Sequence, residues 1–138
     1  MVRIFCFGSD ISRDPAAVKA YREDPLVYQG KMLVRTAAEI LQATQSIQSR
    51  LDEINYPILI LHGGADTVTD PVGSQKLYED AVTHDKTLKI YDGFYHEVFN
   101  EIGKEQVLRD LVDWLDHRQA PPTVFGRYAG DGEYEDDE

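Results

Sequence analysis

The run Pro57-Ile-Leu-Ile-Leu-His-Gly-Gly-Ala-Asp66 decides which fold this sequence predicts. An unbroken aliphatic stretch ends at His62 and two glycines. A short continuous apolar run bounded by turn residues is typical of a strand that is buried on both faces, as in a parallel sheet. A second run, Thr87–Tyr91, ends at Asp92-Gly93 and predicts a second strand of the same kind.

Helical patterns follow both strands. The pair Asp70-Pro71 predicts a helix from about Val72 to Thr83, because aspartate caps helix N-termini and proline fits the first turn. A second amphipathic pattern predicts a helix over Lys104–Arg118. The order of strand, helix, strand and helix predicts an α/β fold with two parallel strands, flanking helices and a right-handed crossover.

The segment before these elements also has helical character. Asp14-Pro15 predicts a short helix that runs to about Arg22, before Asp24-Pro25 ends it. A longer helix is predicted from Lys31, because apolar residues recur there every three or four positions. They are Leu33, Ala37, Ile40, Leu41, Thr44, Ile47 and Leu51. We expect this stripe to pack on a core; the alternative is that part of it lines an apolar substrate channel.

The composition describes one ordinary soluble domain. The chain has 138 residues and a formal net charge of -11, and six of its acidic residues lie between Ala120 and Glu138. An acidic chain lacks the basic face that nucleic-acid binding needs. No apolar run approaches the ~18 residues of a membrane span, so we expect a cytoplasmic protein, or one peripheral to membranes. Cys6 is the only cysteine, which excludes an intrachain disulfide, and no residue spacing predicts a zinc site.

Two polar residues follow the predicted strands at positions where active sites form. Asp66 follows the first strand and His96 follows the second. The carboxyl ends of parallel strands share one edge of a sheet, so the two side chains can meet. A carboxylate against one imidazole nitrogen fixes the tautomer and leaves the other nitrogen to accept a proton. Asp70 competes for the orienting role, but its place before Pro71 favours a helix cap, so we expect Asp66 to be the partner of His96.

The other histidines carry weaker signals. His62 ends the apolar strand, and we expect it to be a packed or hydrogen-bonded structural residue. His84 and His117 stand in polar surroundings and are expected to be solvated.

Several separate motifs, in order, resemble the monoacylglycerol lipase family of α/β-hydrolases, to which caffeoylshikimate esterases and lysophospholipase-like proteins are similar. The matching stretches are Asp10-Ile-Ser-Arg-Asp-Pro15, Asp24-Pro-Leu-Val-Tyr28, Leu61-His-Gly-Gly-Ala-Asp66, Asp85-Lys-Thr-Leu-Lys-Ile-Tyr91 and Gly93-Phe-Tyr-His96. The resemblance implies a serine hydrolase that cleaves carboxylic esters of lipids or related molecules without a cofactor. It also implies that Asp66 and His96 are the acid and base of a catalytic triad.

The nucleophile of such a triad is absent from the sequence. The family's serine stands in Gly-x-Ser-x-Gly, on a sharp turn between a strand and a helix. The serines here are Ser9, Ser12, Ser46, Ser49 and Ser74, and none has a glycine two positions away on both sides. The pair Gly126 and Gly130 centres on Tyr128. Gly8-Ser9 and Cys6 are formal candidates, but neither stands in the required motif.

We therefore expect this chain to correspond to the carboxyl-terminal half of an α/β-hydrolase, a truncated member with little or no esterase activity of its own. The expected organisation is the end of a cap region and its return helix over residues 1–51, the hydrolase core over 52–119 and an acidic, disordered tail over 120–138. The alternative is a non-catalytic binding or interaction protein derived from a hydrolase. An exposed sheet edge also predicts self-association.

Overall fold

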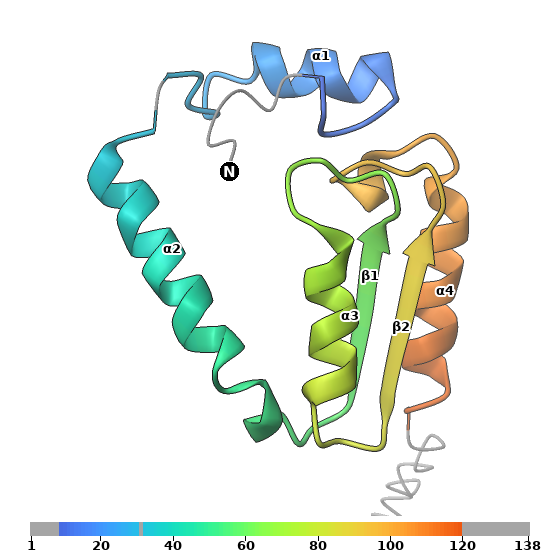
Figure 1. Ribbon diagram of the computed structural model, residues 1–138. Coiled ribbons are helices and arrows are strands. Elements are labelled where there is room, and N and C mark those ends of the chain that lie inside the picture. The colour runs from blue at the N-terminus through green and yellow to red at the C-terminus, as the bar shows by residue number, and fades with distance from the viewer. Residues whose placement is uncertain (1–8, 31, 120–138) are drawn as a thin grey trace, which may run out of the picture.

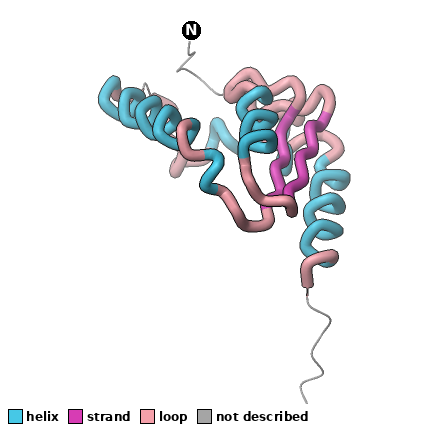
Figure 2. The backbone as a smooth tube through the Cα atoms, turned by 60° about the horizontal axis from the view of Figure 1, so that its bottom comes forward, coloured by secondary structure: helices cyan, strands magenta, loops and turns pink. Residues whose placement is uncertain are grey.

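Two parallel strands form the centre of the molecule in a computed structural model that describes residues 9–30 and 32–119 (Figures 1 and 2). Strand β1 (Ile58–Gly63) pairs along its whole length with β2 (Lys86–Tyr91), in register from Ile58 opposite Lys86 to Gly63 opposite Tyr91. Both predicted strands and their parallel pairing are confirmed. The expected tail over residues 120–138 and the candidate Cys6 lie outside the described residues.

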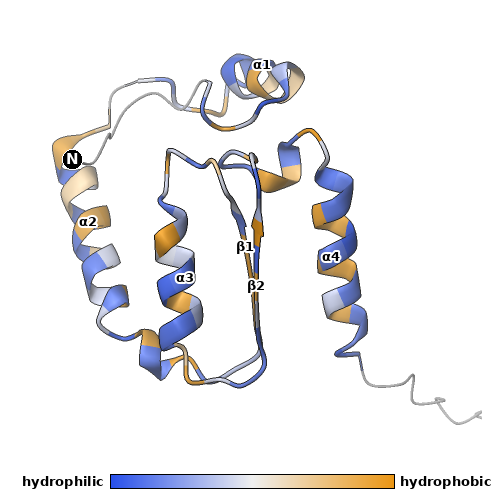
Figure 3. Cartoon of the chain, turned by 45° about the vertical axis from the view of Figure 1, so that its right-hand side comes forward, coloured by the Kyte–Doolittle hydropathy of each residue, from blue (hydrophilic) through white to orange (hydrophobic). Residues whose placement is uncertain are grey.

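Helices cover both faces of this small sheet. Helix α3 (Pro71–Asp80) connects the strands, and α4 (Lys104–Asp116) follows β2; Figure 3 shows them on opposite faces of the sheet. Both helices were predicted to within a few residues. The side chain of Asp70 accepts a hydrogen bond from the Val72 amide at 2.9 Å and so caps α3 as expected.

The amino-terminal segment forms two further helices. Helix α1 (Pro15–Glu23) begins at the predicted Asp14-Pro15 cap and lies beyond the carboxyl ends of the strands (Figure 1). Helix α2 (Val34–Gln48) begins three residues later than predicted and lies outside α3, on the same side of the sheet (Figures 1 and 3). A short 3₁₀ turn, η1 (Leu51–Glu53), then leads into β1. None of the helices in the described ranges combines the length and apolar character that a bilayer crossing requires.

The core is small and lies under the carboxyl ends of the strands. Tyr91, Phe94, Val98 and Val107 are buried in one cluster, with Leu61 packed against it. The rings of Tyr91 and Phe94 stack with their centroids 5.4 Å apart. Val98 belongs to a second 3₁₀ turn, η2 (Val98–Asn100), and Val107 belongs to α4. The packing therefore concentrates where the loop after β2 meets α4, next to His96.

Two expectations about burial are wrong. The apolar stripe does not pack on a core along α2, because the helix has no buried residue and Ile47 is 62% exposed. Of the residues in the stripe, only the last, Leu51 in η1, is buried. The strand β1 is not buried on both faces, since only Ile60 and Gly63 are fully buried along it. The common reason is that a two-stranded sheet offers too little surface to cover the apolar side chains that its helices and strands present.

Candidate active site

A buried carboxylate stands at the end of β1. The side chain of Asp66 is only 1% exposed. Its Oδ1 accepts hydrogen bonds from the amides of Val68 at 2.7 Å and Thr69 at 3.0 Å. Its Oδ2 accepts a hydrogen bond from the hydroxyl of Thr69 at 2.8 Å. The loop thus folds around the carboxylate and satisfies both of its oxygens, which is what a buried charge requires.

The imidazole of His96 meets this carboxylate from the loop after β2. Nδ1 of His96 lies 2.8 Å from Oδ2 of Asp66, across 30 positions of sequence. The carboxylate only accepts hydrogen bonds when ionised, so Nδ1 donates and Nε2 carries the lone pair of the neutral ring. The side chain of His96 is 36% exposed, and no hydrogen bond to its Nε2 is found within the described ranges. The structure therefore brings together the two predicted residues and leaves one ring nitrogen able to accept a proton.

Asp70 does not share this position. Its carboxylate caps α3, whereas the Asp66 carboxylate contacts His96.

The loop after β1 and the loop after β2 are held against each other by backbone hydrogen bonds. The Gly64 amide donates to the Tyr91 carbonyl at 2.7 Å, and the Ala65 amide donates to the Phe94 carbonyl at 2.9 Å.

A second histidine also contacts the Asp66 carboxylate. Nε2 of His62 lies 3.1 Å from Oδ2 of Asp66 and 3.1 Å from the carbonyl oxygen of Thr69, and Nδ1 lies 2.6 Å from the hydroxyl of Ser74. Both neighbours of Nε2 accept hydrogen bonds, so Nε2 carries a proton. The prediction that His62 is hydrogen-bonded is confirmed. Its contact with Asp66 was missed, although both residues stand at the end of the same strand.

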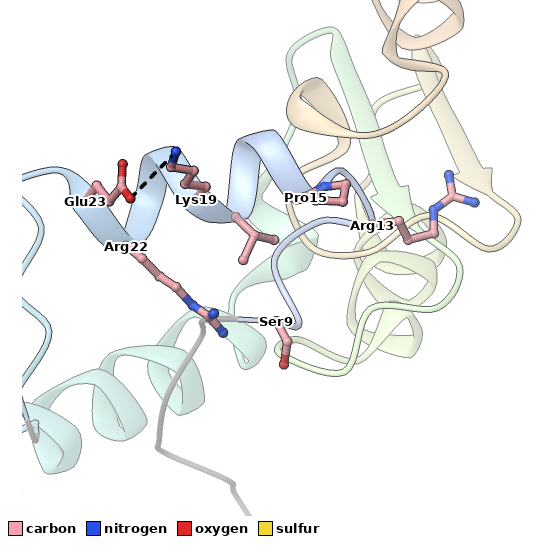
Figure 4. Close-up of a pocket in the computed structure, with 7 residues that line it drawn as sticks. Ser9, Arg13, Pro15, Lys19, Arg22 and Glu23 are labelled. Carbon is pink, nitrogen blue, oxygen red and sulfur yellow. Dashed lines mark ion pairs between the residues drawn. The ribbon is translucent and has the colours of Figure 1, made fainter.

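Two serines near the amino-terminal end of the described chain, Ser9 and Ser12, are hydrogen-bonded away from His96. The hydroxyl of Ser12 donates to the Asn100 carbonyl at 2.7 Å, and that of Ser9 donates to Asp10 at 3.0 Å. Ser9 also lines a shallow pocket beside α1, in which its neighbours are charged side chains and His96 is not among the lining residues (Figure 4). The charged residues that line it are Arg13, Lys19, Arg22 and Glu23. None of these positions offers a hydroxyl to His96.

A second buried carboxylate, which the sequence analysis did not single out, lies next to this site. Glu101 is 1% exposed, and its side chain forms an ion pair with Arg13, Nε to Oε2, at 2.9 Å. The same carboxylate accepts a hydrogen bond from the amide of Tyr95, the residue before His96, at 2.8 Å. Glu101 stands between Asn100 and Ile102 and belongs to no periodic pattern, so only the three-dimensional contacts identify it.

Both buried carboxylates remain ionised more readily than free ones. Burial raises the pKa of Asp66, but hydrogen bonds from His96, Thr69 and Val68 outweigh it and hold the pKa below its usual value. Burial likewise raises the pKa of Glu101, and hydrogen bonds from the Tyr95 amide and from Arg13 lower it further than burial raises it.

Acidification is therefore expected to destabilise the fold through these two groups. A carboxyl group whose pKa is lower in the folded than in the unfolded state adds stability above its unfolded pKa, about 4, and that stability is lost as pH falls through the folded pKa. Urea unfolding followed from about pH 6 down to about pH 3 measures the loss. Asp66→Asn and Glu101→Gln should each flatten the pH dependence in this range. A variant that keeps the full wild-type slope would contradict the assignment for that residue.

No cluster of three or more potential metal ligands occurs in the part of the chain that the structure describes. The contact between Asp66 and His96 supports the chemistry of a carboxylate–imidazole pair.

Comparison with known proteins places this chain in a family. A family model described as serine aminopeptidase, S33, matches residues 8–103. Monoacylglycerol lipase of Mycolicibacterium smegmatis is 38% identical over 105 residues, which are 76% of this chain and 38% of that protein. Caffeoylshikimate esterase of Arabidopsis thaliana is 39% identical over 109 residues, 77% of this chain and 33% of that protein.

The solved structures agree with the sequence relatives. Crystalline monoacylglycerol lipase from Paleococcus ferrophilus matches with a TM-score of 0.76 and 33% identity, over 83% of this chain and 44% of that one. The described elements thus form part of an α/β-hydrolase fold, as predicted. The chain spans between a third and two-fifths of the length of the Mycolicibacterium smegmatis lipase and the Arabidopsis thaliana esterase. It belongs to the serine aminopeptidase S33 family, has part of an α/β-hydrolase fold and resembles monoacylglycerol lipases.

Proposed function

We propose that this chain carries the acid and base of a serine-hydrolase site that cleaves carboxylic esters of lipids or related molecules. In this site His96 is the general base and Asp66 orients it. The observation that carries the proposal is the 2.8 Å contact between Nδ1 of His96 and Oδ2 of Asp66. The names of the relatives, monoacylglycerol lipase and caffeoylshikimate esterase, support an ester as the substrate class.

The chemistry follows from which nitrogen is free. With Nδ1–H donated to Asp66, Nε2 takes the proton of a serine hydroxyl while the serine oxygen attacks the ester carbonyl. The resulting imidazolium gives that proton to the leaving alcohol as the carbon–oxygen bond of the ester breaks. Water then replaces the alcohol: Nε2 takes its proton, the hydroxide oxygen attacks the acyl-enzyme, and the serine recovers a proton as the acid leaves. The buried, ionised Asp66 stabilises the imidazolium in both halves.

The serine of this mechanism is not supplied by these 138 residues. They contain no Gly-x-Ser-x-Gly stretch, and Ser9, Ser12 and Ser74 have hydrogen-bond partners other than His96. We propose the organisation expected from the sequence, with the end of a cap over residues 1–51, the core over 52–119 and the acidic tail over 120–138. In this organisation the acid and base lie in the core, and the nucleophile must come from outside the 138 residues.

The purified 138-residue chain is accordingly expected to be inert in two assays. A fluorophosphonate probe, which reacts with activated serines, should label no residue, and hydrolysis of monoacylglycerol should not exceed the rate in buffer. Removal of a triad nucleophile abolishes covalent catalysis, which is the physical reason. A full-length monoacylglycerol lipase serves as the positive control. Stoichiometric labelling of any serine in this chain would contradict the proposal that the nucleophile is missing.

A second candidate function is that of a non-catalytic interaction protein. The observation that favours it is the exposed apolar face of α2, on which Ile40, Leu41 and Ile47 are 51%, 49% and 62% exposed. Large exposed apolar patches mark surfaces that associate. Sedimentation velocity at increasing concentration tests for self-association, with Ile47→Lys as the variant expected to weaken it. A monomer at all concentrations, without a co-purified partner, would count against this candidate.

A further inference from the structure

The backbone amides on both sides of His96 are held by hydrogen bonds, one to Glu101 and one to the distant Ile11. The amide of Tyr95, immediately before His96, donates to Oε1 of Glu101 at 2.8 Å. The amide of Glu97, immediately after it, donates to the carbonyl oxygen of Ile11 at 2.8 Å. Ile11 is itself only 2% exposed. The histidine thus sits between two anchored amides.

Glu101 is the centre of this arrangement. Besides the Tyr95 amide, Oε1 accepts a hydrogen bond from the amide of Arg13 at 3.0 Å. Oε2 accepts one from Nε of Arg13 at 2.9 Å and one from the amide of Ile102 at 3.1 Å. Four donors therefore surround a carboxylate whose side chain is completely buried. The guanidinium of Arg13 also lies 4.8 Å from the centre of the Phe94 ring and donates to the Ile102 carbonyl at 3.0 Å.

Such a group is too costly to bury without these partners. Taking a carboxylate out of water costs several kcal/mol, and only well-aligned charged and hydrogen-bonding neighbours offset that cost. The segment Ile11–Arg13 and the loop Tyr95–Ile102 are therefore held as one unit, although about 88 positions separate the paired residues. An ion pair between Arg13 and Glu101 would stabilise the fold wherever the two residues lay. The position of this pair points to the site, because the two anchored amides lie directly before and after His96.

We propose that Glu101 is a positioning residue for His96. Together with Arg13 and the Ile11 carbonyl, it fixes the backbone of residues 95–97 so that Nδ1 of His96 stays within hydrogen-bond distance of Asp66. The inference rests on the proposed function, in which His96 is the base. Ile11–Arg13 leads directly into α1, so the same contacts tie the proposed cap segment to the position of the base (Figures 1 and 4).

A ¹⁵N-labelled 138-residue chain tests the proposal by nuclear magnetic resonance. The Nδ1–H of His96, donated to a buried carboxylate, should give a resolved downfield proton that exchanges slowly with water. Glu101→Gln should accelerate this exchange about tenfold or more, which corresponds to the loss of a hydrogen bond to a charged group. The assignment of the resonance is made with His96→Gln.

Asp110→Asn is the matched control. Asp110 also forms an ion pair, with Lys89 at 2.6 Å, and accepts a hydrogen bond from the Tyr91 hydroxyl at 2.9 Å, but it does not contact residues 95–97. A merely structural role of Glu101 predicts that both variants lose stability and that neither changes the His96 signal while folded. An unchanged His96 resonance in folded Glu101→Gln would overturn the positioning role and leave the proposed function intact. Absence of the resonance from the wild-type chain would overturn the Asp66–His96 pair and with it both proposals.

A second measurement needs no variant and therefore does not depend on how Glu101→Gln folds. In the wild-type chain, the amides of Tyr95 and Glu97 should exchange with deuterium as slowly as those in the ladder between β1 and β2. Slow exchange at these positions supports the anchoring of both flanks of His96. Exchange as fast as that of an exposed loop would overturn it.

Discussion

Gly63→Ala is expected to lower the free energy of unfolding by about 3 kcal/mol or more, the largest single effect of any small substitution in the described chain. A Cβ at Gly63 would lie 2.0 Å from the carbonyl oxygen of Tyr95 and 2.5 Å from that of Phe94. Both obstacles are backbone atoms, so no side-chain rotation relieves the contact. The loop that carries His96 would have to move away from the end of β1.

Gly73→Ala provides the matched control. Nothing lies within 4 Å of a Cβ at Gly73, which belongs to the first turn of α3. Alanine there is expected to leave stability unchanged or to raise it by about 0.5–1 kcal/mol, because glycine loses more backbone entropy in a helix. Urea unfolding of the two variants measures the contrast. Equal effects at the two positions would show that the close packing of β1 against residues 94–95 is not required for folding.

The sequence pattern predicted only part of the role of Gly63-Gly64. Gly63-Gly64 was interpreted as the point where a strand ends, and β1 does end at Gly63. A turn that needs a positive φ is not the reason, since the described glycines with positive φ are Gly93 and Gly103. Gly63 is needed because another loop passes over it. Periodicity cannot show this, since the obstacle comes from residues more than thirty positions away.

The elements themselves were predictable because their signals are local. Asp14-Pro15 and Asp70-Pro71 each combine a capping side chain with a residue suited to the first turn, and both helices begin there. The proximity of Asp66 and His96 was also predictable, because it follows from parallel pairing of the strands that precede them. The rule that the carboxyl ends of parallel strands share one edge of a sheet was enough to place the two residues together.

Burial was the part that sequence alone could not give. The α2 stripe has the spacing of a packed face, yet spacing does not say which surface is available to cover it. Glu101 shows the converse, since a charged residue is expected outside and is among the most buried in the described chain. Its burial depends on Arg13 and on the Tyr95 amide, and that combination exists only after the chain has folded.

A complete enzyme built around this chain is expected to hydrolyse esters through Asp66 and His96. This enzyme is a chimera, in which residues 9–119 of the chain replace the corresponding part of the Mycolicibacterium smegmatis monoacylglycerol lipase. The chain is 38% identical to that lipase over 105 residues. The lipase then supplies the remainder of the fold. If His96 is the base, His96→Ala should lower kcat by about 10⁶-fold, because the serine hydroxyl is then no longer deprotonated during attack. The release of product from a soluble ester measures kcat.

The two aspartates of one loop give the decisive comparison. Asp66→Asn should lower kcat by a smaller but still large factor of about 10⁴, because an amide at that position no longer holds His96 in the tautomer with a free Nε2. Asp70→Asn makes the same chemical change four positions away, where the side chain caps α3, and asparagine is an equally good cap. It should therefore leave kcat within about threefold of the parent chimera, since it does not contact His96. Equal losses in the two variants, with unchanged thermal transitions, would remove Asp66 from the proposed triad. A large loss confined to Asp66→Asn would assign the orienting carboxylate to the residue that lies 2.8 Å from His96.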